Sequence, residues 1–519
     1  MKPVFFFLLL GLFACRPNNG GDSVPTESQR VYYEIFLRSF SDSNGDGIGD
    51  IKGLTSKLDY LAELGIGGLW LMPIHPSGSY HKYDVRDYYG IDPEYGTMED
   101  FRTLLKEAHS RDIKVIIDLV LNHTDDEHPW FQAALKGPEN PFRPFYVWSH
   151  PDSIAEAPHL WHDQAADGEV ENNSGERFYG FFWKGMPDLN FDHAPVRDSI
   201  IQAGRYWLEE VGVDGFRLDA ALFIYPYYEG PQAENLQKTL QWWESFHQAM
   251  EQAHPNTFLV GEVWQSDSVL APFLGRGMDA VFHFNLSDWI IETVRSEKDS
   301  LGLALRVQQF QEQLAMFSAA NPQRTDALFL TNHDQDRLRS RLGGNWRQAR
   351  MAASILLTLP GTPFIYYGEE LGMLGAKPDE QIREPFPWAL VGEDSCQTTW
   401  EALAFNTPDH TPPLSLQQFK EGSLWKHYRM LIQFRNIHPA MQYGAIEPYK
   451  GALPQGVLAY YRVLDGKRLL VVHQLAGSRA VLTWQGAGVV IFSTDPNCGI
   501  SENVLRMMPY STVVLEPGS

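Results

Sequence analysis

The sequence predicts an α/β fold, because one local pattern repeats along most of the chain. From about Val31, short runs of β-branched and aromatic residues alternate with loops and with longer amphipathic stretches. Strands that alternate with helices in this way are typical of a parallel sheet. The pattern stops after about Gln442, where only short strand-like runs remain. We therefore expect an α/β core followed by a smaller antiparallel β domain.

Eight strand-like runs make up the α/β part. They are VYYEIF from Val31, GGLWLMP from Gly67, KVIIDLV from Lys114, GFRLD from Gly215, FLVGEVW from Phe258, AVFHFNL from Ala280, ALFLTNH from Ala327 and FIYYGEE from Phe364. Eight strands with intervening helices over roughly 400 residues fit a (β/α)8 TIM barrel. In such a barrel the catalytic groups lie at the C-terminal ends of the strands. We assign residues 30–122 and 191–440 to the barrel.

The longest gap between predicted strands, residues 123–190, separates the third strand from the fourth. It is rich in Trp, Pro, His and Asp and shows little helical periodicity. A connection of this length within a barrel is usually functional. We predict a small inserted domain that leans over the barrel mouth.

Residues 441–519 carry the strand-like runs of the C-terminal part. These are GVLAYYRVL, RLLVVHQL, AVLTWQ, GVVIFS and STVVLEP. Short strands that follow one another without helices favour an antiparallel β domain.

The N-terminus, MKPVFFFLLLGLFAC, predicts export from the cytoplasm. One Lys precedes an apolar run that is too short to span a bilayer, as in a secretory signal peptide. The ending LFAC resembles a lipoprotein signal of residues 1–15, in which Cys15 is lipidated. The alternative is an ordinary signal peptide cleaved nearby, which would release a soluble secreted protein. Residues 16–29 are polar and rich in Gly and Pro, as expected of a flexible tether.

The charge balance argues against two classes of partner. The 519 residues include 42 Lys and Arg against 65 Asp and Glu, a formal net charge of −23. Nucleic acid and anionic membrane surfaces are therefore poor partners, so we expect membrane contact only through the lipid anchor. Besides Cys15, the chain has only Cys396 and Cys498, and the sequence leaves open whether these two pair.

Four predicted strand ends carry acidic residues beside His or Arg. They supply Asp118, Asn122 and His123; Arg217 and Asp219; Glu262; and His333 and Asp334. In a barrel these ends converge on one mouth. Two carboxyl groups there can act as nucleophile and general acid/base on a glycosidic bond. Any one of these carboxylates taken alone is better explained as a solvated or salt-bridged surface group, but their joint occurrence favours an active site.

The chain resembles glycoside hydrolase family 13, the α-amylase family. The motifs that carry the resemblance are DLVLNH at 118–123, GFRLDAA at 215–221, GEVW at 261–264, FLTNHD at 329–334, HKYDVRDYYGIDPEYGT at 81–97, MPDLN at 186–190 and GTPFIYYGEELGM at 361–373. The MPDLN motif is intermediate between the forms of oligo-1,6-glucosidases and neopullulanases. The resemblance covers roughly residues 30 to 440, and it implies a barrel, an inserted domain B and a β-sandwich domain C.

The resemblance also implies a role for each site residue. Asp219 would be the nucleophile that forms a covalent glycosyl-enzyme, and Glu262 the acid that protonates the leaving oxygen and then activates water. Asp334 would bind sugar hydroxyls and stabilise the transition state. Three further residues would bind the same sugar: His123, His333 and Tyr83, the last of them stacked beneath the ring. Arg217 would keep Asp219 ionised.

The stretch DSNGDGIGD at 42–50 predicts a calcium site. Asp42, Asn44, Asp46 and Asp50 stand at near-alternate positions, and the carbonyl of Ile48 can add a further oxygen. The stretch resembles the structural calcium loop after the first barrel strand in one branch of the family. The alternative is an Asp/Asn/Gly turn that binds nothing.

A second calcium site of the family would involve Asn122 and Asp188. In many relatives it includes a His four residues after the nucleophile, which in this chain is Phe223. The backbone carbonyl of Phe223 could replace that side chain, so the sequence leaves this site open.

Three departures from the family pattern bear on the substrate. Leu222-Phe223 replaces a Lys-His pair that helps many α-amylases bind the leaving side of the glucan. Ala220 fits a preference for α-1,4 bonds, and Tyr80 stands near the acidic residue that closes the pocket of exo-acting glucosidases. We expect an endo-acting α-1,4-glucan hydrolase on starch or maltooligosaccharides.

Two alternatives to this function remain open. The first is an exo-acting α-glucosidase, oligo-1,6-glucosidase or maltose-converting transglycosylase on the same scaffold. The second is a non-catalytic glucan-binding protein. The presence of all three carboxylates, Asp219, Glu262 and Asp334, argues against the second alternative.

Overall fold

The structure is a computed structural model of the whole chain. It describes residues 29–154, 157–163, 175–225, 232–317, 324–390, 392–483, 488–501 and 504–518. The predicted signal peptide with Cys15 and nearly all of the predicted tether lie outside these residues.

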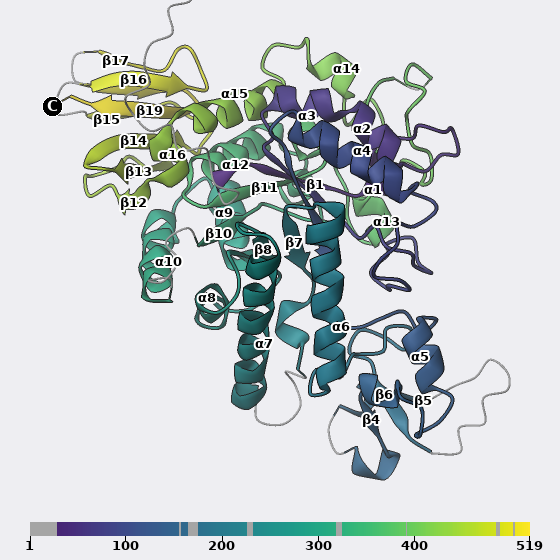
Figure 1. Cartoon of the computed structure of the whole chain (residues 1–519). Helices are drawn as coiled ribbons and strands as arrows, with labels where there is room; N and C mark the ends of the chain where they lie inside the picture. The colour runs from purple at the N-terminus through teal and green to yellow at the C-terminus, as the bar shows by residue number, and fades with distance from the viewer. Residues whose placement is uncertain are drawn as a thin grey trace, which may run out of the picture.

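Eight parallel strands close into a barrel, as predicted (Figure 1). They are β1 (Tyr32–Ile35), β2 (Gly68–Leu71), β3 (Lys114–Leu119), β7 (Gly215–Leu218), β8 (Phe258–Gly261), β9 (Ala280–Phe282), β10 (Thr325–Leu328) and β11 (Thr362–Tyr366). Their order around the barrel follows the chain, and β11 closes it against β1. Six of the eight strands lie within a run that the sequence pattern predicts, whereas β10 and β11 each begin two residues before the predicted run and overlap it.

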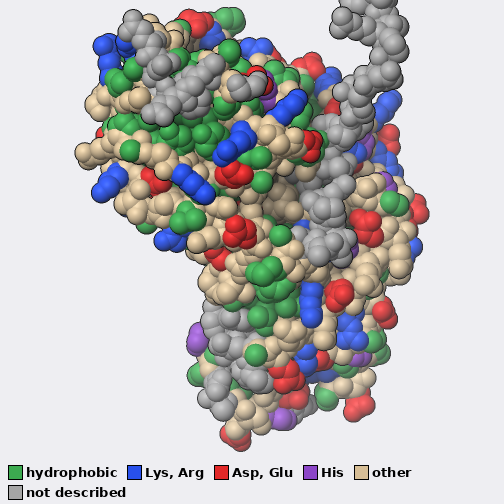
Figure 2. Space-filling view, turned by 90° about the vertical axis from the view of Figure 1, so that its left-hand side faces the viewer, with side chains coloured by type: hydrophobic (Ala, Val, Ile, Leu, Met, Phe, Trp, Pro, Cys, Tyr) green, Lys and Arg blue, Asp and Glu red, His purple; other side chains and the backbone are tan. Residues whose placement is uncertain are grey.

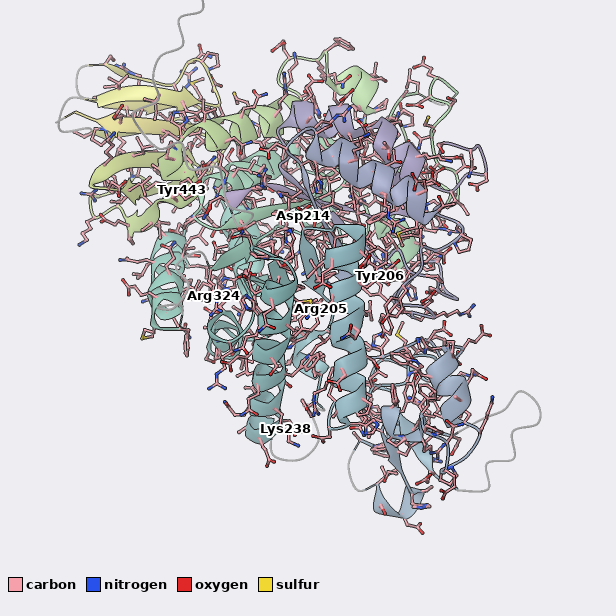
Figure 3. All side chains as sticks on the ribbon, in the orientation of Figure 1. Arg205, Tyr206, Asp214, Lys238, Arg324 and Tyr443 are labelled. Carbon is pink, nitrogen blue, oxygen red and sulfur yellow. The ribbon has the colours of Figure 1, made fainter. Side chains whose placement is uncertain are left out.

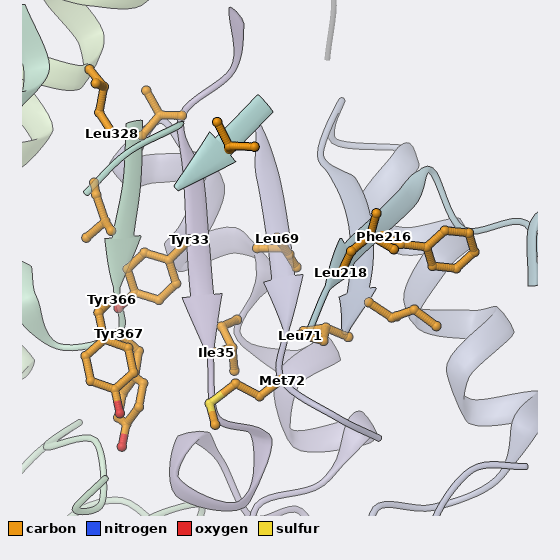
Figure 4. Packing of buried hydrophobic residues seen from close by; sticks show 14 of the residues in the cluster. Tyr33, Ile35, Leu69, Leu71, Met72, Phe216, Leu218, Leu328, Tyr366 and Tyr367 are labelled. Carbon is orange, nitrogen blue, oxygen red and sulfur yellow. The ribbon is translucent and has the colours of Figure 1, made fainter. Parts of the chain in front are cut away.

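The side chains of each strand alternate between two hydrophobic layers. Tyr33, Ile35, Phe216 and Leu218 belong to the larger layer between the barrel and its helices (Figure 4). The inner layer is mostly aromatic, and its members are Tyr32, Trp70, Ile116, Phe258, Val260, Ala280, Phe282, Phe284, Ala327, Phe329 and Phe364. The barrel is therefore filled, and only its mouth is open to a ligand.

Helices follow the strands and cover the outside of the barrel. The longer ones are α3 (Leu58–Leu64), α4 (Met98–His109), α6 (Ala194–Arg205), α7 (Gln232–Ala253), α8 (Asp267–Gly275), α9 (Phe284–Arg295), α10 (Leu303–Phe317), α12 (Trp346–Thr358) and α15 (Leu424–Ile437). The shorter ones are α1 (Leu37–Phe40), α2 (Ile51–Ser56), α11 (Leu338–Arg341), α13 (Asp379–Ile382), α14 (Leu414–Gln417) and α16 (Pro439–Tyr443). A further short helix, α5 (Pro129–Ala134), belongs to the segment between β3 and β7. Local capping fixes several starts. For example, Thr97 and Asp100 form a reciprocal capping box at α4.

The end of the barrel opposite the mouth is also closed by polar contacts. Asp214, labelled in Figure 3, directly precedes β7 and accepts hydrogen bonds from Lys114 Nζ at 2.9 Å and from the Val115 backbone N–H at 2.7 Å. This contact fixes the start of β7 against β3. The C-terminal end of β7, which carries Asp219, is left to form the mouth.

The segment between β3 and β7 contains a small sheet of its own. Its strands are β4 (Trp148–Ser149), β5 (Trp161–Asp163) and β6 (Arg177–Tyr179), in the order β4-β6-β5. This sheet and α5 lie at the other end of the molecule from the C-terminal strands (Figure 1). The predicted limits of the inserted domain, 123–190, stay a prediction.

The C-terminal part is antiparallel, as predicted. One sheet has the order β12-β13-β14-β19-β16 and a second the order β15-β18-β17. The strands are β12 (Ala445–Pro448), β13 (Val457–Leu464), β14 (Lys467–Gln474), β15 (Ala480–Thr483), β16 (Gly488–Ser493), β17 (Gly499–Ser501), β18 (Val504–Met507) and β19 (Thr512–Pro517). The sequence pattern missed β12, β17 and β18, which have at most four residues each.

The surface carries charged side chains of both signs. On the face shown in Figure 2, acidic and basic side chains are interspersed rather than gathered by sign. Cys396 and Cys498, the cysteines of the described residues, are both free thiols. Within the same residues, we find no helix long and apolar enough to cross a membrane.

Candidate active site

The predicted site residues come together at the C-terminal ends of the barrel strands. Arg217 lies on β7, Asp219 directly after it and Glu262 directly after β8. His333 and Asp334 lie in the loop after β10, and Tyr83 and His123 lie beyond β2 and β3. One hydrogen-bonded network connects all seven residues.

Arg217 is the centre of this network, and its side chain is only 1% exposed. Its Nη1 donates to Asp219 Oδ1 at 2.6 Å and to Asp118 Oδ1 at 2.9 Å, and its Nη2 donates to Glu262 Oε2 at 2.7 Å. The guanidinium carbon also lies 5.1 Å from the ring centre of Trp70. A planar guanidinium can hold several carboxylates in fixed directions. This explains why a cation and an anion share one face of an apolar strand.

Glu262 is placed so that it can carry a proton. Burial raises its pKa above the ordinary value, the charges of Asp219 and Asp334 raise it further, and Arg217 opposes the shift. The backbone N–H of Ala220 lies 3.3 Å from Glu262 Oε2. Ala220 has φ 47° and ψ 38°, a left-handed conformation that side chains tolerate poorly. The chain therefore turns sharply after Asp219, and this turn directs an N–H group at Glu262.

Asp334 and His333 form a second charged pair in the mouth. His333 Nε2 lies 3.1 Å from Asp334 Oδ2, and Arg383 Nη2 lies 3.1 Å from Asp334 Oδ1. Burial opposes ionisation of Asp334, but His333 and Arg383 outweigh it and hold the pKa of Asp334 well below its ordinary value. Asp334 therefore remains a carboxylate and can only accept hydrogen bonds.

Tyr83 and His123 line the mouth beside this pair. The Tyr83 ring stacks on the His333 ring, with centroids 5.4 Å apart. His123 Nε2 lies 3.1 Å from the Tyr83 carbonyl oxygen, and burial lowers the pKa of His123. A neutral His123 thus buttresses the Tyr83 backbone. The predicted contacts of both residues with a sugar stay predictions.

Sequence reasoning did not identify Arg383 or the function of Glu34. Besides its contact with Asp334, Arg383 donates from Nε to the His333 carbonyl at 3.0 Å and from Nη1 to the Tyr80 hydroxyl at 3.2 Å. Arg383 stands alone in IREPFPW, without a neighbouring site residue to draw attention to it. Glu34 was detectable in principle, because it is an acidic residue within the apolar run VYYEIF.

Aromatic rings surround Phe223, the position that the sequence assigns to the leaving side. The Phe223 ring stacks on the Phe181 ring at 4.3 Å, and its centroid lies 6.3 Å from that of Phe182, which is 46% exposed. Leu222 is buried, and Trp264, two residues after Glu262, is 56% exposed and stacks on Phe284. That Leu222 and Phe223 contact the leaving side of a glucan stays a prediction.

The predicted calcium loop is wound by its own side chains. Asp42, Asn44 and Asp46 each accept the backbone N–H two residues ahead through a side-chain oxygen, at 2.8–2.9 Å. Asp50 instead caps α2 by accepting the Gly53 N–H at 2.7 Å. Across the described residues, no group of three or more His, Cys, Asp and Glu side chains has the arrangement of a metal site. The donor chemistry nevertheless fits Ca²⁺, which takes carboxylate, amide and carbonyl oxygens.

The candidates for the second calcium site bond to each other. Asn122 Nδ2 donates to Asp188 Oδ2 at 3.1 Å, and the Phe181 backbone N–H donates to Asp188 Oδ1 at 3.0 Å. Burial raises the pKa of Asp188 to about 8. These contacts join the end of β3 to the end of the inserted segment without any further group.

Two carboxyl groups on one guanidinium, one of them with a raised pKa, can act as nucleophile and acid on a glycosidic bond. With the (β/α)8 barrel around them, they define a glycoside hydrolase. More particularly, the chain belongs to the α-amylase family. Residues 34–444 match the model of the alpha amylase catalytic domain, and residues 457–514 match that of the alpha-amylase SusG C-terminal domain.

Relatives of known name cover nearly the whole chain. Alpha-amylase 3 of Dictyoglomus thermophilum is 40% identical over 500 residues, which are 96% of this chain and 95% of that protein. A 4-alpha-glucanotransferase of Thermotoga neapolitana is 34% identical over 471 residues, 90% of this chain and 99% of that protein. The crystal structure of an alpha-amylase from H. orenii has a TM-score of 0.84 at 41% identity and covers 95% of this chain and 100% of that one.

Proposed function

We propose that the protein hydrolyses internal α-1,4-glucosidic bonds of starch or maltooligosaccharides with retention of configuration. The observation that carries this proposal is that Arg217 holds Asp219 at 2.6 Å and Glu262 at 2.7 Å on one guanidinium. The retaining mechanism needs two carboxyl groups about 5–5.5 Å apart, whereas an inverting enzyme needs more room, for a water between them; a shared guanidinium favours the closer arrangement.

The proposed mechanism has two steps. Protonated Glu262 donates its proton to the glycosidic oxygen while Asp219 attacks the anomeric carbon, which releases the leaving chain and forms a glycosyl ester. Ionised Glu262 then takes a proton from water, whose oxygen attacks the same carbon and frees Asp219. Asp334 and His333 bind the hydroxyl groups of the reacting sugar, and Tyr83 and His123 support its ring.

Two features favour α-1,4 bonds within chains. Ala220, which directly follows Asp219, fits a preference for α-1,4 bonds, because α-1,6-specific members of the family typically have Val there. Tyr80, rather than an acidic residue, stands beside Arg383. Relatives named α-amylase and 4-alpha-glucanotransferase are both similar over the whole chain, so transfer to a second glucan is the second candidate function.

A product time course on maltoheptaose tests the endo-acting proposal. We expect maltooligosaccharides of several lengths to appear together from the first time point. Early release of glucose alone would instead indicate an exo-acting α-glucosidase. Products longer than maltoheptaose would indicate transfer, and parallel assays on pullulan, isomaltose and trehalose define the linkage.

We also propose that the loop 42–50 binds one structural Ca²⁺ through Asp42, Asn44, Asp46, Asp50 and the Ile48 carbonyl. Removing the ion with a chelator should lower the melting temperature by several degrees, because a ligand at about 100 times its Kd stabilises by roughly 2.7 kcal/mol. Asp46→Ala should abolish the response to added Ca²⁺, whereas the control Asp152→Ala, also at an exposed turn, should keep it. An unchanged melting temperature after chelation of the wild type would rule out this ion.

The remaining proposals concern the ends and limits of the domains. Cys15 anchors the exported protein to a membrane by a lipid. Domain A consists of residues 30–122 and 191–440, domain B of residues 123–190 and domain C of residues 441–519. In a detergent partitioning experiment, the protein expressed with its own N-terminus should enter the detergent phase. The Cys15→Ser variant should enter the aqueous phase. A wild type found in the aqueous phase would favour ordinary secretion.

A further inference from the structure

Glu34 is a buried carboxylate without a role in the proposed mechanism. It lies on β1 and is 2% exposed. Tyr32, two residues earlier, belongs to the aromatic layer inside the barrel, and Tyr33 and Ile35 belong to the outer layer. Glu34 therefore points into the barrel, above Tyr32. An ionised carboxylate in such a place is costly unless a cation and hydrogen-bond donors meet it.

His333 supplies both of these. Glu34 Oε1 lies 2.5 Å from His333 Nδ1, and the His333 backbone N–H donates to the same oxygen at 3.3 Å. Because a carboxylic acid is a stronger acid than an imidazolium, the proton between Oε1 and Nδ1 resides on the ring, which leaves Glu34 a carboxylate. Glu34 therefore fixes both the ring and the backbone of His333.

The hydrogen bonds at the other ring nitrogen assign its proton. His333 Nε2 lies 2.6 Å from the Tyr83 hydroxyl, which donates its only proton to Asp118 Oδ2 at 3.0 Å. The hydroxyl therefore accepts from Nε2, and the carboxylate of Asp334 lies 3.1 Å from the same nitrogen as an ion-pair partner. With the Glu34 carboxylate at Nδ1, the His333 ring carries a proton on each nitrogen and is an imidazolium.

The charged and titratable groups around His333 come from several elements. Glu34 of β1 and the adjacent Asp334 contact the ring directly. The others are Tyr83, which stacks on the ring; Asp118 and Arg217, which lie beyond Tyr83; Glu262, whose pKa the His333 charge lowers; and Arg383, which binds the His333 carbonyl. Burial opposes protonation, but Asp334 and Glu34 outweigh it and raise the pKa of His333 to about 9.

We propose that Glu34 is a positioning residue that keeps His333 doubly protonated and aimed at Asp334 and the sugar hydroxyls at neutral and mildly alkaline pH. Glu34 transfers no proton itself and forms no bond to substrate. The proposal rests on the proposed function for its effect on catalysis, but the charge state of His333 can be measured without any substrate.

The direct test is NMR titration of ¹⁵N-labelled histidine, with His333→Asn to identify the His333 signals. In the wild type these signals should remain those of an imidazolium up to about pH 8. Glu34→Gln keeps the size and the acceptor but removes the charge, so the titration midpoint of His333 should fall by roughly 1–3 pH units. A wild-type His333 that is neutral at pH 7 would overturn the proposal, even if Glu34→Gln did not fold.

Asp326→Asn is the matched control. Asp326 lies on β10 outside the barrel interior, and its Oδ2 is 2.8 Å from Nδ1 of another buried histidine, His283. Its loss should move the His283 signals and leave those of His333 unchanged. If Asp326→Asn shifted His333 as much as Glu34→Gln does, the effect would be general loosening of the fold and the proposal would fail.

The catalytic consequence is a loss that grows with pH. Relative to wild type at the same pH, kcat/KM of Glu34→Gln on maltoheptaose should fall further at pH 8 than at pH 5.5, where both rings are protonated. The extra loss should be about twofold if the His333 midpoint falls by roughly 1 unit and about tenfold if it falls by roughly 2 units. Equal losses at the two pH values would overturn the positioning role. A wild type inactive on every glucan would refute the proposed function, while the titration would still decide the role of Glu34.

Discussion

At the scale of single residues, Arg217 sets the geometry of the mouth. Its guanidinium donates to Asp118, Asp219 and Glu262 at 2.6–2.9 Å, and it is almost fully buried. Without it, three carboxylates would face one another in a poorly solvated site. Arg217 thus offsets the repulsion that the paired carboxyl groups of a glycosidase create.

Replacing Arg217 tests this view. Arg217→Lys keeps the charge but loses the planar fork, so Lys cannot hold Asp219 and Glu262 in fixed directions at once. We expect kcat/KM to fall by at least about 10²-fold, comparable to the removal of one preorganised donor. The control is Arg205→Lys. Arg205, labelled in Figure 3, is 36% exposed and pairs with Glu209. Similar losses in both variants would contradict a special role for Arg217.

Residues in dense motifs were predictable, and isolated ones were not. Arg217 and Asp219 stand two apart in a strand-like run, and period-2 alternation alone places them on one face. Arg383 lies in a loop, and nothing in its local sequence shows that the chain returns it to Asp334. The role of Glu34 depends on a contact between residues 299 positions apart, which no local pattern specifies.

At the scale of elements, all eight barrel strands were predictable because buried parallel strands are short apolar runs between helices. The three missed strands of the C-terminal sheets have three or four residues each, too few to show alternation. The left-handed turn at Ala220 was not predictable either, because Ala does not favour that conformation. Tertiary contacts with β8 hold it there.

The short 3₁₀-helix after β11, η7 (Glu369–Leu371), contains two buried glutamates that lie outside the proposed mechanism. Glu369 accepts the Tyr428 hydroxyl at 2.8 Å, and Glu370 accepts the Tyr33 hydroxyl at 2.8 Å. Burial raises the pKa of Glu369 to about 8 and that of Glu370 to about 7. Both shifts make the folded state bind protons more tightly than the unfolded state.

The stability of Glu369→Gln should therefore differ from wild type in a pH-dependent way. Between about pH 4.5 and 8 the unfolded wild type releases a proton that the folded state retains, so its free energy of unfolding falls as pH rises. Gln cannot titrate, and the variant should gain stability relative to wild type across this range. Urea unfolding at several pH values measures this difference, with the exposed Glu393→Gln as control. A difference that does not change with pH would contradict the raised pKa.

At the scale of the whole molecule, the order of the helices and strands was predictable, but the complete set of residues that surround the site was not. Strand count and the loss of periodicity after Gln442 indicate a barrel followed by an antiparallel domain, which the structure confirms. The barrel then brings Asp219, Glu262 and Asp334 to one mouth without further information. The segment between β3 and β7 contacts the barrel mouth through rings that are far apart in the sequence, such as Phe181 and Phe223. Such packing is not specified by any local pattern.

The central claim for the whole molecule is that Asp219 forms a covalent glycosyl-enzyme. The test uses Glu262→Gln with α-maltosyl fluoride, whose fluoride ion leaves without help from an acid. The variant lacks the base that activates water, so the glycosyl ester on Asp219 should accumulate. Intact-mass analysis followed by peptide mapping should find one maltosyl unit on the peptide that carries Asp219, and Asp219→Asn in the same background should remove it. An adduct on Asp118 or Asp334, or consumption of the fluoride to a β-anomeric product without any adduct, would contradict the claim.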